Sequence, residues 1–217
     1  MKREIIITSD GSTTIHLPEW NEQYHSKHGA IQEAYHVFIK HGLNYMNKDS
    51  ISILEIGFGT GLNCFITFLE TKKKINYTGI EAYPVPPEEI NKLNYINNLK
   101  VENQAAIFSK IHEVAWERKT KITDDFSLVK QQKFFKDIDN NNEFDLIYFD
   151  AFGARVQPEL WTEKIFGKMY NALKNEGVLV TYSAKGSVRR AMQSVGFTVE
   201  RLPGPPGKRE MLRAIKK

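Results

Sequence analysis

The chain has 217 residues, of which 41% are hydrophobic and 26% are charged, and its formal net charge is +4. These values are typical of a globular protein with a core large enough to need no disulfide or structural metal. A single cysteine, Cys64, excludes an internal disulfide, and the spacing of His25, His28 and His36 fits no closed metal site. The N-terminal segment lacks the apolar stretch of a signal peptide, and no stretch is long and apolar enough to cross a membrane. We therefore expect a cytoplasmic protein without a bound metal.

The predicted elements alternate between strands and helices. In chain order they are short strands within 3–20 with a turn at Asp10–Gly11, a helix over 29–46, a strand over 51–57, a helix over 62–74, a strand over 75–84, helices over 86–100 and 101–118, a strand over 144–152, a helix over 158–177, a strand over 177–183, a helix over 187–197, and two strands over 198–202 and 209–217. The segment 122–138 fits neither pattern. This alternation predicts an α/β fold, a doubly wound Rossmann-like parallel sheet with an antiparallel C-terminal edge. Residues 1–48 are predicted to be an N-terminal extension that packs on a domain formed by 49–217.

A glycine-rich loop follows the first buried strand. Its glycines are Gly57, Gly59 and Gly61, with Glu55 two residues ahead of the first. Leu62 occupies the position of the third glycine of a dinucleotide fingerprint, which argues against pyrophosphate binding. The spacing instead resembles the first motif of S-adenosylmethionine-dependent methyltransferases, in which glycines let the backbone approach the cofactor closely.

Acidic side chains downstream of this loop are candidates for the same cofactor site. Glu81 ends the second strand, where a carboxylate can accept both ribose hydroxyls. Asp124 or Asp125 could bind the adenine amino group, although a helix N-cap is an equal alternative. Tyr24 could close over the cofactor or belong to a plain surface turn.

The strand over 144–152 carries the candidates for chemistry. Asp150 lies at its carboxyl end, the edge at which open α/β sheets bind ligands. Its carboxylate could face both the sulfonium and a nucleophile, or it could cap the following loop. Phe152 could stack on a flat substrate or pack in the core.

Several segments together resemble the methyltransferase half of the bifunctional tRNA 5-methylaminomethyl-2-thiouridine biosynthesis proteins and their stand-alone relatives. The matching segments are EIGFGTGLN, IEAYP, FDLIYFDAF followed by PELW, and the stretch from TYSAKG to REML. With YHSKHGAIQEAYHVFI, they cover the chain from about Tyr24 onward. The family has a lysine where this chain has Val156, and Arg155 is the neighbouring candidate for the missing charge.

This resemblance implies transfer of a methyl group from S-adenosylmethionine to the amine of 5-aminomethyluridine, with or without 2-thiolation, at wobble position 34 of tRNA. It also implies roles for the residues already singled out. The cofactor loop would comprise Gly57, Gly59, Gly61 and Asn63, the ribose would bind Glu81, and methyl transfer would take place at Asp150 and Phe152. Because no oxidase segment follows in these 217 residues, another protein or an alternative ammonium-using route would have to supply the aminomethyl group.

Positive charge gathers in residues 185–217, which contain nine lysines and arginines and two glutamates. Clustered cations favour a polyanion, although a solvated basic surface has the same composition. Arg189, Arg190, Lys208 and Arg209 are the candidates for contacts with the anticodon arm. The alternatives are a methyltransferase for a small-molecule amine and a non-catalytic RNA-binding protein with this fold.

Overall fold

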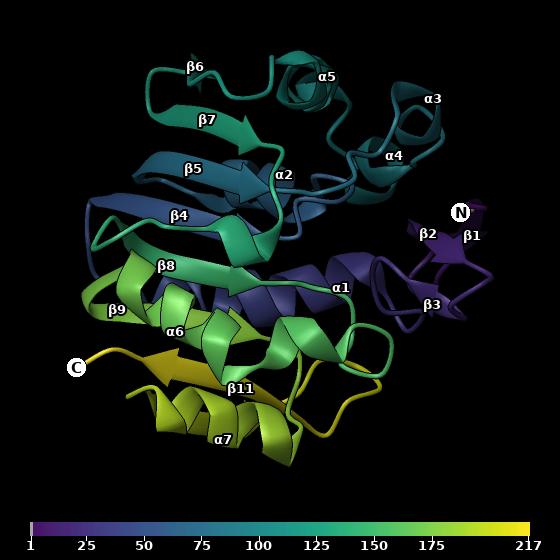
Figure 1. Ribbon diagram of the computed structural model, residues 1–217. Helices are drawn as coiled ribbons and strands as arrows, with labels where there is room; N and C mark the ends of the chain where they lie inside the picture. Colours follow the sequence, from purple (N-terminus) through teal and green to yellow (C-terminus); the bar gives the residue numbers. More distant parts are fainter. Residues whose placement is uncertain (1) are drawn as a thin grey trace.

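An eight-stranded sheet runs through the centre of the computed structural model, which describes residues 2–217 (Figure 1). Its strand order is β10-β11-β9-β8-β4-β5-β7-β6. The pairs among β9, β8, β4, β5 and β7 are parallel, whereas β10, β11 and β6 join antiparallel. The α/β fold with a parallel sheet and an antiparallel C-terminal edge is therefore confirmed. A smaller sheet, β1-β2-β3, lies beyond the carboxyl ends of the parallel strands.

The strands of the two sheets have the following bounds: β1 Glu4–Ile7, β2 Thr13–Leu17, β3 Glu22–Gln23, β4 Ser50–Ile56, β5 Lys74–Ile80, β6 Thr120–Lys121, β7 Phe126–Gln131, β8 Phe144–Phe149, β9 Leu173–Thr181, β10 Thr198–Pro203 and β11 Glu210–Ile215. The helical segments are α1 Ala30–Ala34, η1 Tyr35–Lys40, η2 Leu43–Tyr45, α2 Leu62–Glu70, α3 Pro87–Ile90, α4 Tyr95–Leu99, η3 Glu102–Gln104, α5 Ala105–Glu113, η4 Phe135–Asp137, η5 Pro158–Trp161, α6 Glu163–Ala172 and α7 Gly186–Ser194. Among residues 2–217, no helix has the length and apolar character needed to cross a membrane.

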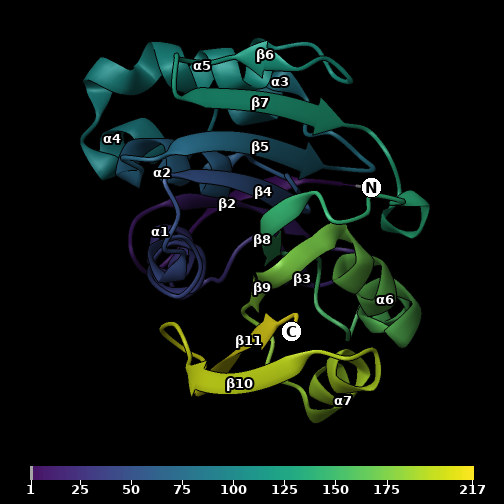
Figure 2. The ribbon, with the colours of Figure 1, turned by 90° about the vertical axis from the view of Figure 1, so that its left-hand side faces the viewer.

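Helices cover both faces of the main sheet, so its central strands are buried on both sides. Every residue of β8 is buried, and β4 is buried almost throughout, as expected for parallel strands between two helical layers. One face packs against α1, η1, α2 and α5, and the other against α6 and α7 (Figure 2). The sheet therefore divides the hydrophobic core into two layers.

The N-terminal segment packs directly on this core. The ring of Phe38, on η1, lies 5.0 Å from that of Tyr148 on β8. Arg3 pairs with Glu89 at 3.1 Å, and this contact ties the smaller sheet to α3. The division of the chain into an N-terminal extension of residues 1–48 and a catalytic domain of residues 49–217 remains a prediction.

Several predicted helices are shorter than the sequence pattern indicates. The helix over 86–100 is two short helices, α3 and α4, with a break before Tyr95. At this break, the Asn94 side chain accepts the backbone N–H of Thr13 at 2.8 Å and so binds the smaller sheet. The ambiguous segment 122–138 contains β7, and the predicted helix over 158–177 stops at Ala172, where β9 begins.

We predict that Leu146→Ala lowers the free energy of unfolding by about 2–5 kcal/mol, because Leu146 is fully buried in β8 and its removal leaves a cavity. Ile7→Ala is the control, since Ile7 is 74% exposed and its truncation should change stability by less than about 0.5 kcal/mol. Urea unfolding followed by circular dichroism measures both. Equal effects of the two variants would contradict the described core.

Candidate active site

The carboxyl ends of the parallel strands form one edge, and the glycine loop is fixed between them. The backbone N–H groups of Gly57 and Phe58 both donate to the carbonyl of Ile80 at the end of β5. On the other side, the N–H of Asp150 donates to the carbonyl of Ile56. The loop after β4 therefore contacts the ends of both neighbouring strands.

Asn63, in the first turn of α2, joins two carboxyl groups at this edge. Its Nδ2 donates to Glu55 Oε1 at 3.0 Å and to Asp150 Oδ2 at 2.9 Å. The other Glu55 oxygen accepts the Tyr77 hydroxyl at 2.9 Å. Glu55 is fully buried, so it lies beneath the loop and orients Asn63 from below.

Burial controls the charge of these two acids. It raises the pKa of Glu55 well above its usual range, while the hydrogen bonds from Asn63 and Tyr77 oppose the rise. Burial likewise raises the pKa of Asp150 to about 7, with the neighbouring Glu33 carboxylate adding to the rise. The hydrogen bond from Asn63 and the ammonium of Lys208 act in the opposite direction. Asp150 is therefore a carboxyl group that exchanges its proton near neutral pH.

The glycine loop needs backbone conformations that only glycine adopts without strain. Gly57, Gly59 and Gly61 have φ of 88°, 48° and 70°. A Cβ on Gly57 would lie 2.7 Å from the backbone oxygen of Asp150. The Gly59 N–H donates to Glu81 Oε2 at 3.0 Å, so the carboxylate at the end of β5 closes over the loop.

The polar groups of this edge fit a cofactor with hydroxyl and amino groups. Asn63 Oδ1 and Gln131 Oε1 are buried acceptors with no hydrogen-bond partner among residues 2–217. Gln131 ends β7, and its backbone oxygen accepts the N–H of Glu81. One edge of the sheet therefore contains two acceptors without partners, the carboxylate of Glu81, and a glycine backbone that a ligand can approach closely. Sequence reasoning missed Gln131, although its place at a strand end was the available signal.

A pocket of about 240 Å³ opens beside Asp150 and is lined by Tyr24, Phe152, Tyr182, Glu33 and Lys208 among others. The Phe152 ring lies 5.0 Å from the Tyr24 ring and 5.8 Å from the Trp20 ring, both in edge-to-face contact. The pocket thus offers an aromatic wall next to a carboxyl group.

Glu33 and Tyr182 are residues of this pocket that sequence reasoning missed. Glu33 interrupts the apolar face of the first helix between Ala30 and Val37, and this buried charge was the signal. Tyr182 follows β9 at the same sheet edge, and its hydroxyl donates to the carbonyl of Ala151 at 2.8 Å. Lys208 forms an ion pair with Glu33, and its contact with RNA remains a prediction.

The prediction that Asp124 or Asp125 binds adenine is wrong. Both residues precede β7, at the amino end of the parallel strands and opposite to the glycine loop. The carbonyl of Asp125 accepts the N–H of Ile75, which lies near the start of β5, and Asp124 pairs with Lys121 at 3.0 Å in solvent. The sequence of residues 122–138 did not show the direction of β7, and this direction places both acids at the edge opposite the glycine loop.

The predicted RNA-binding arginines occupy different environments. Arg155 donates to the carbonyls of Trp20 and Asn21 at 3.1 and 2.8 Å, so it fastens the loop after β8 to the smaller sheet. Arg189 and Arg190 lie in the first half of α7, which follows the carboxyl end of β9. Arg190 and Arg209 are exposed, and Arg189 is half-buried.

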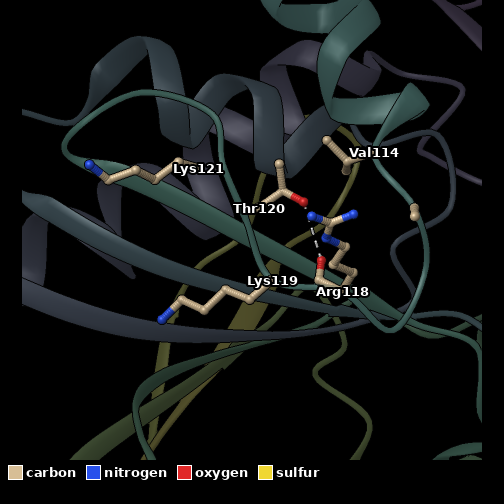
Figure 3. Close-up of a pocket in the computed structure, with 6 residues that line it drawn as sticks. Val114, Arg118, Lys119, Thr120 and Lys121 are labelled. Carbon is tan, nitrogen blue, oxygen red and sulfur yellow. Dashed lines mark hydrogen bonds between the residues drawn. The ribbon is translucent and has the colours of Figure 1, made fainter.

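A second hollow, of about 490 Å³, lies between the end of α5 and β6 (Figure 3). Arg118, Lys119 and Lys121 line it, and the two lysines extend away from Val114. Its three cations are exposed, and no residue of the segment 150–153 is in its lining. The smaller pocket is the better candidate despite its size, because its lining includes the buried Glu33 and residues 151–153, which directly follow Asp150.

The raised pKa of Asp150 predicts how Asp150→Asn changes stability with pH. In the unfolded chain Asp150 ionises near pH 4, whereas in the folded protein it stays protonated until about pH 7. The free energy of unfolding of the wild type therefore falls as pH rises from about 4 to about 7. The asparagine variant has no carboxyl group at this position, so its free energy of unfolding lacks this decrease. Their difference in unfolding free energy should grow by about 1.4 kcal/mol per pH unit in favour of the variant.

Urea unfolding at several pH values measures this difference. Asp124→Asn is the control, because the hydrogen bond and charge of Lys121 lower the pKa of the exposed Asp124, so its carboxylate ionises below this window. A constant difference between Asp150→Asn and wild type from pH 4 to 7 would contradict the description of Asp150.

Comparison with known proteins gives the same family as the site. Residues 91–217 match the family model described as S-adenosyl-L-methionine-dependent methyltransferase. The bifunctional tRNA 5-methylaminomethyl-2-thiouridine biosynthesis protein MnmC of Leptospira borgpetersenii serovar Hardjo-bovis is 26% identical, over 89% of this chain and 32% of that protein. MnmC of Cupriavidus metallidurans is 25% identical, over 96% of this chain and 33% of that protein. This chain spans about a third of the length of these relatives.

Solved structures agree on the fold. MNMC2 from Aquifex aeolicus has a TM-score of 0.76 and 23% identity, covering 100% of this chain and 70% of that chain. Spermidine synthase from Thermotoga maritima has a TM-score of 0.57 and 16% identity, covering 98% of this chain and 72% of that chain. The resemblance noted in the sequence and the predicted cofactor are both confirmed: this chain belongs to the S-adenosyl-L-methionine-dependent methyltransferase family.

Proposed function

We propose that the protein transfers a methyl group from S-adenosylmethionine to the amine of 5-aminomethyluridine, with or without 2-thiolation, at wobble position 34 of tRNA. The product would be the 5-methylaminomethyl nucleoside. The observation that carries this proposal is a half-buried carboxyl group, Asp150, held by Asn63 beside a pocket with an aromatic wall. The similarity to the tRNA 5-methylaminomethyl-2-thiouridine biosynthesis proteins supports the choice of tRNA.

The glycine loop and the strand ends would hold the cofactor, which supplies an electrophilic methyl group when bound. Glu81, which accepts the N–H of Gly59 in the free protein, would instead accept hydrogen bonds from the ribose hydroxyls. The free acceptors of Asn63 and Gln131 would receive amino groups. Tyr24, whose ring lies against Gly59, would cover the loop.

Asp150 would prepare the amine for attack. A free alkylamine has a pKa of about 10, so keeping it neutral at pH 7 costs about 4 kcal/mol. The ionised Asp150 would attract the ammonium, take one proton and orient the nitrogen lone pair. A pKa of about 7 suits this exchange, since a general base works best near the ambient pH. Alignment of the amine in the pocket would supply most of the acceleration.

The basic C-terminal segment would bind the anticodon arm. Arg189, Arg190 and Arg209 would contact phosphates, while the wobble base leaves its stack and lies against Phe152. Arg155 would contribute by holding the loop that carries Phe152. We also infer that a separate enzyme supplies the aminomethyl group.

The proposed location is the cytoplasm, because a single buried cysteine suits a reducing compartment.

Labelled methyl transfer tests the proposed function. The wild type should place label from S-adenosylmethionine in the 5-methylaminomethyl nucleoside when given tRNA that carries 5-aminomethyluridine. Asp150→Asn should bind S-adenosylhomocysteine as the wild type does, yet lower the turnover rate by about 100-fold or more, because proton transfer is lost. Label in free amines alone would favour a small-molecule methyltransferase, and failure to bind the cofactor would favour a non-catalytic RNA-binding protein.

Gly57→Ala tests the cofactor loop. The added Cβ meets the backbone of Asp150 and places alanine at a positive φ, which costs about 1–3 kcal/mol of stability. A loop displaced by this clash should bind S-adenosylhomocysteine about tenfold more weakly in calorimetry. Gly167→Ala is the control, because its Cβ has 3.9 Å of clearance inside α6 and should leave binding unchanged. If folded Gly57→Ala binds S-adenosylhomocysteine as tightly as the wild type does, the glycine loop is not part of the cofactor site.

A further inference from the structure

The pocket beside Asp150 contains a second buried acid whose partner comes from the far end of the chain. Glu33, on α1, is 5% exposed. One of its oxygens accepts the backbone N–H of Ser26 at 3.2 Å, and the other pairs with the ammonium of Lys208. Lys208 lies in the loop between β10 and β11, which reaches toward α1 (Figure 2).

The surroundings of the Lys208 ammonium are those of a binding site for an alkylammonium group. Besides Glu33, its Nζ lies 4.1 Å from the centre of the Tyr182 ring, at cation–π distance. Tyr182 is itself fixed by its hydrogen bond to Ala151, the residue after Asp150. A carboxylate and an aromatic face therefore surround one primary ammonium in a pocket that also contains Phe152.

The ion pair between Glu33 and Lys208 is expected to add little to the free energy of unfolding. Removing two charges from water costs several kcal/mol for each ion, and attraction between them often no more than offsets that cost. Lys208 also remains partly accessible, with 29% of its side chain exposed, so its ammonium has a path to solvent. Glu33 has no such path, since only 6% of its side chain is exposed.

We propose that Glu33 and Tyr182 form the subsite for the cationic amine of the substrate, and that Lys208 occupies this subsite in the free protein. The inference rests on the proposed function, in which the substrate is a primary alkylamine. When the substrate enters, its ammonium replaces that of Lys208 on Glu33. Asp150 lies close enough to Glu33 for the two carboxyl groups to interact, so the bound amine is presented to the residue that takes its proton. The released Lys208 becomes available for a phosphate of the same tRNA.

Binding of two nucleosides tests the exchange without any chemistry. The probes are 5-aminomethyluridine and its neutral counterpart 5-hydroxymethyluridine, titrated by NMR into protein saturated with S-adenosylhomocysteine. The wild type should prefer the amine. Glu33→Gln should weaken amine binding by about 30-fold or more, because the counter-ion is lost, and should leave binding of the hydroxyl compound nearly unchanged.

Two further variants sharpen the test. Lys208→Met removes the competing ammonium and keeps the length of the side chain, so it should bind the amine several-fold more tightly than the wild type does. Glu200→Gln is the matched control, because it makes the same charge change at an ion pair with Arg213 in the β10–β11 hairpin. It should keep the preference of the wild type.

Equal binding of the two nucleosides by the wild type, or a preserved preference in folded Glu33→Gln, would overturn the subsite. If Glu33→Gln does not fold, Lys208→Met decides alone, and unchanged or weaker amine binding overturns the exchange. The proposed function is judged separately by methyl transfer to tRNA. If the wild type methylates tRNA but Glu33→Gln keeps the preference for the amine, only the proposed subsite is wrong. If Glu33→Gln loses that preference but the wild type does not methylate tRNA, only the proposed function is wrong.

Discussion

The amide of Asn63 is the contact on which the site depends, because it donates to carboxyl groups from two neighbouring strands. Glu55 lies one residue before the end of β4 and Asp150 directly follows β8, and both have an oxygen within 3.0 Å of the same nitrogen. Two acids this close cannot both ionise at low cost in a buried setting. Burial and the neighbouring Asp150 carboxylate raise the pKa of Glu55 well above its usual range, while burial and the Glu33 carboxylate bring the pKa of Asp150 to about 7. The hydrogen bond thus fixes the geometry while the surroundings set the charge.

The fold creates this contact through the direction of its strands. Parallel strands bring their carboxyl ends to one edge, and the loop after β4 must turn tightly there to begin α2. Gly57 allows the turn because it approaches the backbone of Asp150 more closely than any other residue could. Asn63 then follows two residues after Gly61, where the first turn of α2 directs its side chain back to the strand ends.

The sequence predicts those parts of the site that depend on local pattern. Strand, glycine loop and helix follow one another between Glu55 and Asn63, and Asp150 and Glu81 stand at the ends of buried strands. The alternation of elements predicts the sheet and its antiparallel edge. Each of these signals lies within a few residues of the group that it identifies.

Contacts between distant segments could not be predicted in this way. Glu33 and Lys208 are 175 residues apart, and only the folded chain brings them into one pocket. The break before α4 arises because Asn94 bonds to Thr13, 81 residues earlier. Asp124 was misplaced because a pair of acids beside a strand does not reveal at which end of the strand it lies.

The pKa of Asp150 is the quantity that most directly tests this account. Carbon-13 NMR of the side-chain carboxyl groups measures it in the free protein, with Asp150→Asn identifying the resonance. We expect Asp150 to titrate near pH 7. A titration near pH 4 would mean that Asp150 is ionised throughout the neutral range, and would contradict its role as the group that takes the proton of the amine.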